Sequence, residues 1–368
     1  MNEKRKIRFA LIGAGWRAMY YVRVAEALPE LFECAGILCR SAEKAERTER
    51  NTGVRAVLSE QDVISLNPDF IVVAVSKDRL AEVSLAWLAH GFPVLCETPG
   101  SLDLEWLKQL WQAGRQGKLV TAEQYLRYPE HSARITLLEN GLIGDRQYAY
   151  LSAAHGYHGM SLIRGYLHLP SDMPYTITAQ TVKLPTVRTL TRYEAFHDGS
   201  IADTERTLAM IRFDNGAAAL YDFDSEQYRS SIRNNLIKVQ GTSGELINDT
   251  LYRLSDDCRP EQDSLHTETV IAETGDPNPN LSTIREISRI TWKGEEIYRP
   301  PFGLCRLGQD ETAIASLLYD MGAYARDEGE APYALKDSMQ DAVMAIDLAE
   351  AVRRNEPVRF DEHVPWFE

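Results

Sequence analysis

The first third of the chain alternates short apolar runs with stretches whose apolar residues recur at helical spacing. Residues 69–75 contain a continuous apolar run, which begins after Asp69, as expected for a strand that is buried on both faces. Expected strands are 7–12, 33–40, 55–58, 69–75, 93–96 and 119–122, and expected helices are 19–28, 42–50, 80–89 and 102–111. Strands that alternate with helices indicate a parallel, doubly wound sheet with its ligand site at the carboxyl ends of the strands.

The pattern changes at about residue 123. Helices are expected at 131–140 and 160–167, on either side of a strand at 147–154, and β-type alternation dominates beyond residue 176. Two hairpins are expected, the first at 208–223 around Asn215-Gly216, which suits the positive φ angles of a tight turn, and the second at 286–298. Helices at 311–326 and 337–354 close the chain, so the second part is α+β, with mostly antiparallel strands.

A glycine turn joins the first expected strand to the first expected helix. Residues 13–18 read Gly-Ala-Gly-Trp-Arg-Ala, the G-x-G-x-x-(G/A) arrangement that binds dinucleotides. Gly13 permits the tight turn, Gly15 lets the backbone approach a pyrophosphate, and Ala18 is small enough for close helix–strand packing. The turn predicts an NAD(P) site at the amino end of the helix. The expected cofactor contacts of this turn are Gly13, Ala14, Gly15, Trp16 and Arg17.

Composition excludes several classes of protein. The 368 residues are 44% apolar and carry a formal net charge of −14, so the basic face that nucleic-acid binding needs is not expected. No apolar stretch approaches the roughly eighteen residues of a membrane span. Five scattered cysteines without a C-x-x-C motif indicate reduced thiols rather than disulfides or a zinc site. Because no signal-like segment precedes the first strand, we expect a cytoplasmic protein. The residue pattern predicts no metal site either.

Several weaker motifs occur in a characteristic order along almost the whole chain. They are the Gly13-Ala14-Gly15 turn, the segments 43–45, 81–83 and 94–99, Gly-Leu-Ile-Gly at 141–144, the 241–244 turn, and the final helix before Pro357-Val358. In this order and spacing the chain resembles the Gfo/Idh/MocA family of glucose–fructose oxidoreductase and inositol dehydrogenase. The resemblance implies a Rossmann dinucleotide-binding domain over residues 1–123. It also implies a substrate and oligomerisation domain over 124–368, built on a large open, mostly antiparallel sheet.

Two departures from the family pattern bear on catalysis. Family members usually carry Glu-Lys-Pro at the end of the fifth strand, where this chain has Glu97, Thr98 and Pro99. A threonine hydroxyl can hydrogen-bond a substrate but is far too weak an acid or base to replace an ammonium group. In the family's Asp-x-x-x-His motif the histidine matches His158, but the aspartate position is Ala154.

The resemblance also implies the groups that face the cleft. His158 takes the position of the family's general acid/base, and His155 could supply a second imidazole there. The alternative is that both histidines cap a strand and bond to the backbone. The candidate catalytic residues are therefore His158, His155 and Thr98.

Further residues are placed near substrate or cofactor by the same resemblance. Glu123 and Tyr125 could face the substrate, although structural roles are equally open for both. Arg164 could meet an anionic group of the substrate, with a packing or salt-bridge role as its alternative. The other expected cofactor contacts are Arg40, Ser41, Val75, Ser76, Glu97 and Gln124.

The end of the second strand bears on the choice of cofactor. NAD-preferring folds normally place Asp or Glu there to bind the ribose hydroxyls. On the family register that position is Cys39, followed by Arg40 and Ser41. The missing carboxylate removes repulsion against a 2′-phosphate, and the guanidinium of Arg40 could bind it. The alternative is that Arg40 stacks on adenine in either cofactor; the sequence favours NADP.

The function expected from these features is that of an NAD(P)-dependent oxidoreductase. Its small-molecule substrate would be a secondary alcohol or ketone of a sugar, cyclitol or sugar derivative. Because the family lysine and aspartate are both missing, two alternatives stay open. One is a nucleotide-binding sensor or partner subunit, and the other is a lyase or glycosidase with tightly bound cofactor.

The expected sheet between about residues 179 and 291 predicts an oligomer. The chain offers few helices to cover both faces of this sheet, and an uncovered apolar face is normally buried against a partner. We therefore expect a homodimer or homotetramer. Candidate contact residues alternate along the first hairpin, although the inward face of the sheet would look similar: Ala209, Ile211, Ala217, Ala219 and Tyr221.

Overall fold

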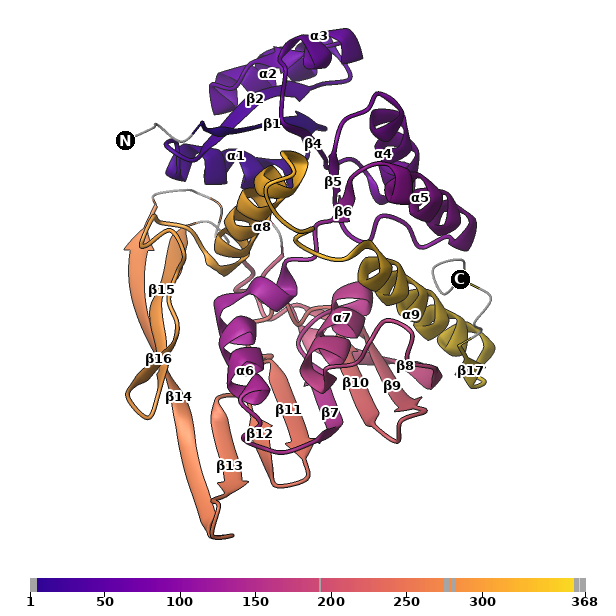
Figure 1. The fold of residues 1–368 in the computed structure, drawn as a ribbon, viewed down its shortest axis with the longest axis vertical. Coiled ribbons are helices and arrows are strands. Elements are labelled where there is room, and N and C mark those ends of the chain that lie inside the picture. Colours follow the sequence, from indigo (N-terminus) through magenta and orange to yellow (C-terminus); the bar gives the residue numbers. More distant parts are fainter. Residues whose placement is uncertain (1–4, 192, 275–277, 279–281, 361–363, 365–368) are drawn as a thin grey trace.

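In a computed structural model the chain forms two sheets with helices packed on them, and residues 5–191, 193–274, 278, 282–360 and 364 are described (Figure 1). The first sheet is parallel, with the order β3-β2-β1-β4-β5-β6. Its strands are β1 (Ile7–Ile12), β2 (Phe32–Leu38), β3 (Ala56–Val57), β4 (Phe70–Val73), β5 (Val94–Cys96) and β6 (Leu119–Thr121). The strand order reverses between β1 and β4: the first strands follow one another on one side of β1, and the later strands on the other. In such a sheet the ligand crevice lies at the carboxyl ends of the strands at this point.

The helices of the first sheet begin at polar caps that the sequence places just before them. Ser41 caps α2 by accepting a hydrogen bond from the Lys44 N–H, and Asp103 caps α5 by accepting one from the Trp106 N–H. The elements are α1 (Ala18–Ala27), α2 (Ala42–Thr52), α3 (Glu60–Ser65), the 3-10 turn η1 (Lys77–Arg79), α4 (Leu80–Ala89) and α5 (Leu104–Gln116). The periodicity predicted four of these helices and missed α3 and η1, which are short.

The second sheet has the order β16-β15-β14-β13-β12-β11-β7-β10-β9-β8-β17, and only the β7–β10 pair is parallel among its described strands. Its first strands are β7 (Arg146–Ser152), β8 (Tyr175–Val187), β9 (Ile201–Phe213), β10 (Ala218–Asp224), β11 (Leu236–Gly241) and β12 (Gly244–Ile247). The others are β13 (Thr250–Leu254), β14 (Pro260–Glu273), β15 (Thr283–Trp292), β16 (Glu295–Tyr298) and β17 (Val358–Arg359). Both predicted hairpins are present, and the predicted fold class is confirmed.

Helices cover one face of this large sheet. They are the 3-10 turn η2 (Tyr125–Arg127), α6 (Pro129–Glu139), α7 (Gly156–Leu167) and α9 (Leu335–Arg354), of which α7 packs on β7 and α9 on β8 (Figure 1). No helix of the described chain, α9 included, is long and apolar enough to cross a membrane.

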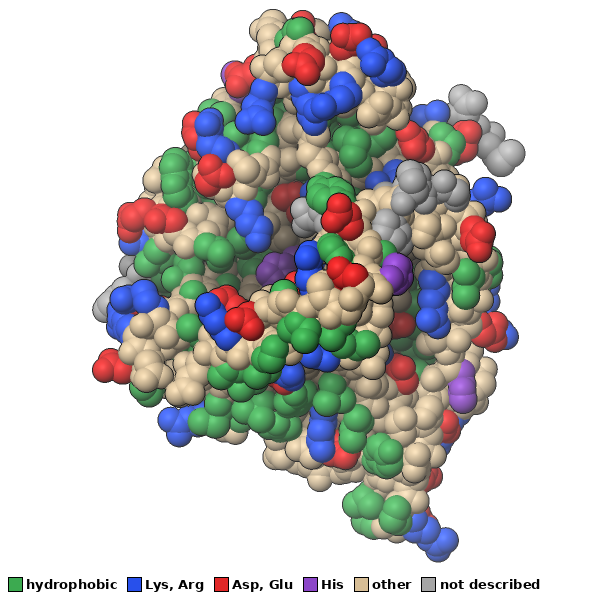
Figure 2. All heavy atoms as spheres, turned by 180° about the vertical axis from the view of Figure 1, so that it is seen from behind, with side chains coloured by type: hydrophobic (Ala, Val, Ile, Leu, Met, Phe, Trp, Pro, Cys, Tyr) green, Lys and Arg blue, Asp and Glu red, His purple; other side chains and the backbone are tan. Residues whose placement is uncertain are grey.

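The two faces of the sheet correct the contact residues expected for oligomerisation. Ala209, Ile211, Ala217, Ala219 and Tyr221 are at most 6% exposed, because they point toward the covering helices. The alternate residues Leu208, Met210 and Leu220 are 42%, 45% and 37% exposed on the opposite face. Figure 2 shows hydrophobic side chains gathered over this part of the molecule. The predicted contact residues therefore lie one position out of register with the free face.

One helix from the second part of the chain completes the core of the first domain. Leu317, Leu318 and Met321 of α8 (Gln309–Ala325) are fully buried and belong to the same core as Phe9 and Phe70 of the first sheet. Figure 1 shows α8 between the two sheets, beside α1. The boundary expected at residue 123 falls between β6 and η2, but a linear division there separates α8 from the core that it fills.

Candidate active site

The glycine turn between β1 and α1 has the shape that a dinucleotide needs. Gly13 has φ +107°, and a Cβ atom there would lie 2.5 Å from the carbonyl oxygen of Ala74, just after β4. Only glycine fits this position. A Cβ atom at Gly15 would meet nothing within 4 Å, so the turn borders open space where a pyrophosphate can approach. Val75 and Ser76 follow Ala74 and lie at the same edge of the sheet.

Arg17 connects this turn to three other parts of the fold. Its Nε donates to Glu97 Oε1 at 2.8 Å, and its Nη1 donates to Asp310 Oδ2 of α8 at 2.6 Å. With the Gln124 amide oriented to donate to the Ala122 carbonyl, its oxygen accepts from Arg17 Nη2 at 2.8 Å. We call Arg17, Glu97, Gln124 and Asp310 the Arg17 cluster. Arg17 therefore binds two other predicted cofactor residues, Glu97 and Gln124.

Three candidate residues from separate elements form a hydrogen-bonded chain. Thr98, after β5, has its Oγ1 3.2 Å from His158 Nε2 of α7. His158 Nδ1 lies 2.8 Å from Oε2 of Glu123, which follows β6. The other carboxyl oxygen of Glu123 accepts from the Tyr125 N–H at 2.8 Å. We call Thr98, His158 and Glu123 the proton relay, because the order hydroxyl, imidazole and carboxyl suits proton transfer.

Burial governs the protonation of this relay. The Glu123 side chain is fully buried, and loss of hydration raises its pKa to about 8. Burial, and to a smaller extent the nearby Arg17 cation, lower the pKa of His158 to about 3. Both shifts disfavour charge, so below about pH 8 the pair holds one transferable proton without a net charge. The carboxyl and imidazole groups therefore titrate as a unit.

Aromatic rings surround the relay. The Tyr125 ring lies 4.3 Å from the His158 ring and stacks on Tyr128 at 4.6 Å. The His155 ring lies 5.2 Å from His158, and the hydroxyl of Tyr228 lies 2.7 Å from His155 Nδ1. Seen from behind, the molecule has a hollow between its two parts in which histidine atoms are visible (Figure 2). Tyr228 was not predicted, because it lies in the loop after β10 with no motif around it.

Comparison with known proteins identifies the first domain. Residues 7–125 match the family model GFO_IDH_MocA, described as an oxidoreductase family with an NAD-binding Rossmann fold. The first domain thus matches the Gfo/Idh/MocA family. This match confirms the predicted resemblance and the predicted class, an NAD-binding oxidoreductase. No curated protein matches the chain in sequence.

Solved structures of the same fold cover both domains. Levoglucosan dehydrogenase, in complex with NADH and levoglucosan, superposes with a TM-score of 0.67 at 18% identity, over 98% of this chain and 100% of the other. A putative myo-inositol dehydrogenase from Sinorhizobium meliloti 1021 gives 0.65 at 15% identity, over 97% and 100%. An oxidoreductase from Agrobacterium radiobacter with NAD⁺, L-tartaric acid and magnesium also gives 0.65 at 15%, over 96% and 98%. These likenesses extend the fold beyond the matched Gfo/Idh/MocA domain.

Arg40 and Ser41, the two residues expected to contact the cofactor after β2, have different surroundings. The Ser41 hydroxyl caps α2, whereas Arg40 is exposed directly after the end of β2. Cys39, at the position of the usual acidic residue, is buried and contacts Thr48. No described residue forms a hydrogen bond or ion pair with the Arg40 guanidinium, which leaves it available to a phosphate.

Arg164 lies apart from the relay. Its Nη1 donates to Asp341 Oδ1 at 2.6 Å and its Nη2 donates to Asp337 Oδ1 at 2.5 Å, both on α9. The arginine side chain is 6% exposed and its charge is balanced by these carboxylates. The structure therefore supports the salt-bridge alternative for Arg164 rather than contact with a substrate anion.

The raised pKa of Glu123 predicts a pH-dependent effect on stability. The unfolded chain releases this proton near the ordinary pKa of 4.5, whereas the folded protein holds it to about pH 8. The contribution of this raised pKa to the stability of the folded protein is therefore complete below pH 4.5 and is lost as the pH rises toward 8. In Glu123→Gln this dependence disappears. The unfolding free energy of the wild-type protein minus that of Glu123→Gln should therefore fall by roughly 1–3 kcal/mol between about pH 5.5 and about pH 8.

Urea denaturation at the two pH values measures this difference. Glu105→Gln is the matched control, because the Glu105 side chain is 75% exposed and its removal should give the same difference at both pH values. A Glu123→Gln difference that does not change with pH would contradict the raised pKa.

Proposed function

We propose that the protein is an NAD(P)-dependent oxidoreductase that interconverts a secondary alcohol and its ketone in a sugar, cyclitol or sugar derivative. The observation that carries this proposal is the proton relay at the carboxyl ends of β5 and β6. The relay adjoins the cofactor turn, because Arg17 of the turn binds Glu97, and Glu97 precedes Thr98. A proton-transfer group beside a dinucleotide site is what alcohol–ketone chemistry requires.

Each residue of the proton relay has a distinct task. A nicotinamide cofactor held at the turn of Gly13 and Gly15 would supply the hydride-transfer chemistry at the carbinol carbon. The Thr98 hydroxyl orients the reacting oxygen, and His158 Nε2, 3.2 Å from that hydroxyl, exchanges the proton. Glu123 balances the charge of the imidazole from the Nδ1 side. Thr98 itself only transmits a hydrogen bond, so the acid–base work of the absent lysine falls to His158 and Glu123.

The aromatic surroundings support a sugar-like substrate. Tyr125 and Tyr228, whose ring centres are 6.3 Å apart, present amphipathic rings beside the relay. Such rings can pack on the apolar face of a pyranose or cyclitol while their hydroxyls form hydrogen bonds. The name of one structural neighbour, levoglucosan dehydrogenase, is consistent with this class.

Two measurements test the proposed activity. NADH or NADPH, followed by nicotinamide fluorescence, should bind below millimolar concentration. With levoglucosan and myo-inositol as first probes, the rate of alcohol oxidation should rise about tenfold per pH unit up to about pH 8, since the deprotonated relay accepts the proton. His158→Asn should lower kcat by about 10²- to 10⁴-fold.

His90→Asn serves as the control for this substitution, because His90 is an exposed histidine paired with Glu60 on the surface. It should leave kcat unchanged. Absence of binding of both cofactors at millimolar concentration would refute the proposal. Cofactor that stays bound without net reduction would instead indicate the lyase or glycosidase alternative.

We further propose that the preferred cofactor is NADP. The exposed Arg40 and the buried Cys39 in place of a carboxylate support this preference. Arg40→Asp should shift the ratio of NADPH to NADH affinity toward NADH by about tenfold or more, because a cation is replaced by a phosphate-repelling group. Fluorescence titration with both cofactors measures the ratio.

The control for charge reversal is Arg259→Asp, in the turn between β13 and β14, which should not change the ratio. An unaltered ratio in Arg40→Asp would exclude Arg40 as the discriminating residue.

A homodimer or homotetramer through the free face of the large sheet is also proposed. The exposed row of Leu208, Met210 and Leu220 supports it, because such an apolar surface favours burial against a second copy. Met210→Asp should shift sedimentation equilibrium at micromolar concentration toward a species of 41.6 kDa. Leu58→Asp, at a residue 53% exposed on the other domain, should not. Wild type that sediments as a single monomer would refute the assembly.

A further inference from the structure

Tyr228 makes two hydrogen bonds to the same residue, His155. The backbone N–H of His155 donates to the Tyr228 hydroxyl oxygen at 2.8 Å, and the same oxygen lies 2.7 Å from His155 Nδ1. The two rings are almost perpendicular, at 88° with centres 5.4 Å apart. One phenol therefore determines both the start of α7 and the orientation of the imidazole that precedes it.

The direction of the second bond follows from hydrogen-bond capacity. The phenol carries a single hydrogen, and its oxygen already accepts the backbone N–H. The Tyr228 hydroxyl has a second side-chain partner, the Tyr125 hydroxyl. A neutral imidazole nitrogen is a stronger acceptor than a second phenol, so we assign the single Tyr228 hydrogen to the bond with Nδ1. The proton of the neutral imidazole then resides on Nε2. Burial lowers the pKa of His155 to about 3, which keeps the ring neutral at physiological pH.

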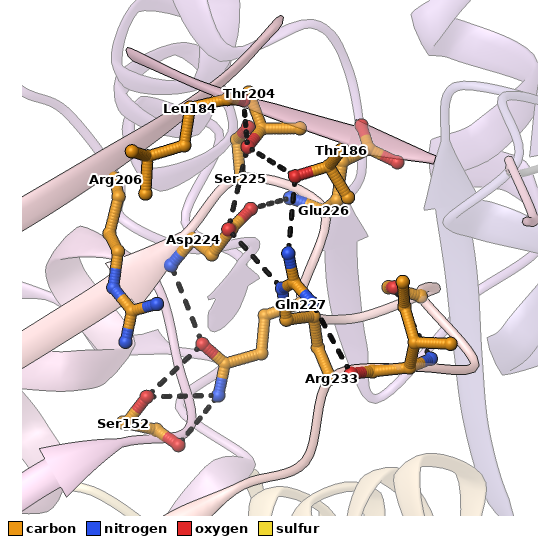
Figure 3. Close-up of polar contacts among 12 residues, drawn as sticks. Ser152, Leu184, Thr186, Thr204, Arg206, Asp224, Ser225, Glu226, Gln227 and Arg233 are labelled. Atoms are coloured by element: carbon orange, nitrogen blue, oxygen red, sulfur yellow. Dashed lines mark hydrogen bonds and ion pairs between the residues drawn. The ribbon is translucent and has the colours of Figure 1, made fainter. Parts of the chain in front are cut away.

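Tyr228 is itself held in place from the same strand end as His155. The preceding residue, Gln227, donates from Nε2 to the Ser152 carbonyl at 2.6 Å, at the end of β7 (Figure 3). Asp224, at the start of the loop, accepts from the Glu226 N–H at 3.0 Å and from the Thr204 hydroxyl at 3.4 Å. His155 lies three residues beyond Ser152, so both partners are positioned from β7.

The other side of His155 faces the proton relay. Its ring lies 5.2 Å from the His158 ring at 75°, and none of the described residues forms a hydrogen bond with its Nε2. An N–H group with no acceptor among the described residues is available to an oxygen atom of a ligand. His155 also lies next to Ala154, which lacks a polar side chain, so the imidazole supplies the polar group at this strand end.

We propose that Tyr228 is a positioning residue that holds His155 as the Nε2–H tautomer, and that this N–H donates to an oxygen of the substrate. This inference deepens the proposed function and rests on it for the identity of the ligand. The site then has two histidines with different tasks. His158 exchanges the proton through the relay, while His155 keeps its proton and only donates a hydrogen bond. The acceptor is a hydroxyl or carbonyl oxygen.

The tautomer can be measured without cofactor or substrate. Nitrogen-15 NMR of protein labelled at its eight histidines distinguishes protonated from unprotonated ring nitrogens, and His155→Gln assigns the His155 signals. In wild type between about pH 6 and about pH 8, His155 should show only an unprotonated Nδ1 and a protonated Nε2. In Tyr228→Phe that single tautomer should be lost, and a signal from protonated Nδ1 should appear.

Tyr221→Phe is the matched control. The Tyr221 hydroxyl accepts from the N–H of Gly156, the neighbour of His155, but bonds no histidine side chain. This variant loses a comparable backbone bond at the start of α7 and should keep the wild-type tautomer. A protonated Nδ1 in wild type, an unaltered tautomer in Tyr228→Phe, or the same change in both variants would each overturn the proposal. Because the NMR measurement needs no turnover, its result can be interpreted even if the oxidoreductase assay fails.

Discussion

The ion pairs and hydrogen bonds of Arg17 join four separate parts of the chain beside the site. Arg17 lies in the glycine turn, Glu97 at the end of β5, Gln124 beyond β6 and Asp310 on α8. The Arg17 side chain is only 20% exposed, so its charge depends on these partners for stabilisation. Removal of one member of such a buried cluster typically costs about 3–5 kcal/mol. The cluster therefore fixes the distance between the cofactor turn and the groups that follow β5 and β6.

The chemistry of the relay follows from where those strands end. Glu97 is held by Arg17 and by the Tyr21 hydroxyl at 2.6 Å, so the next residue, Thr98, is held against His158. Replacement of the family lysine by threonine removes a cation from a region that already contains Arg17. In the proposed mechanism the buried carboxyl of Glu123 supplies the acid–base function instead, because burial moves its pKa into the range where a proton can be exchanged near neutrality. The proposal therefore assigns the role of the absent ammonium group to a buried carboxyl–imidazole pair.

The two faces of the large sheet have separate tasks. One face packs against α7 and α9, and so positions His155 and His158 at the start of α7. The other face has no helix over it within the described residues and presents Leu208, Met210 and Leu220. Because side chains alternate along a strand, the same strands of β9 and β10 serve both the site and the expected contact between subunits.

Local sequence determined the order of elements, the Gly13–Gly15 turn and the position of His158, because periodicity and glycine conformation act within a few residues. The sequence could not say which face of β9 is buried, since Leu208 and Ala209 are neighbours and both apolar; the helices of the structure decided it. From the sequence, Arg17 and Arg164 are likewise available to a ligand. In the structure their charges are balanced by carboxylates of α8 and α9, which lie more than a hundred residues away along the chain. The bond between Tyr228 and His155 carries no sequence signal at all. It exists only because β7 and β10 pair side by side and bring the loops at their ends together.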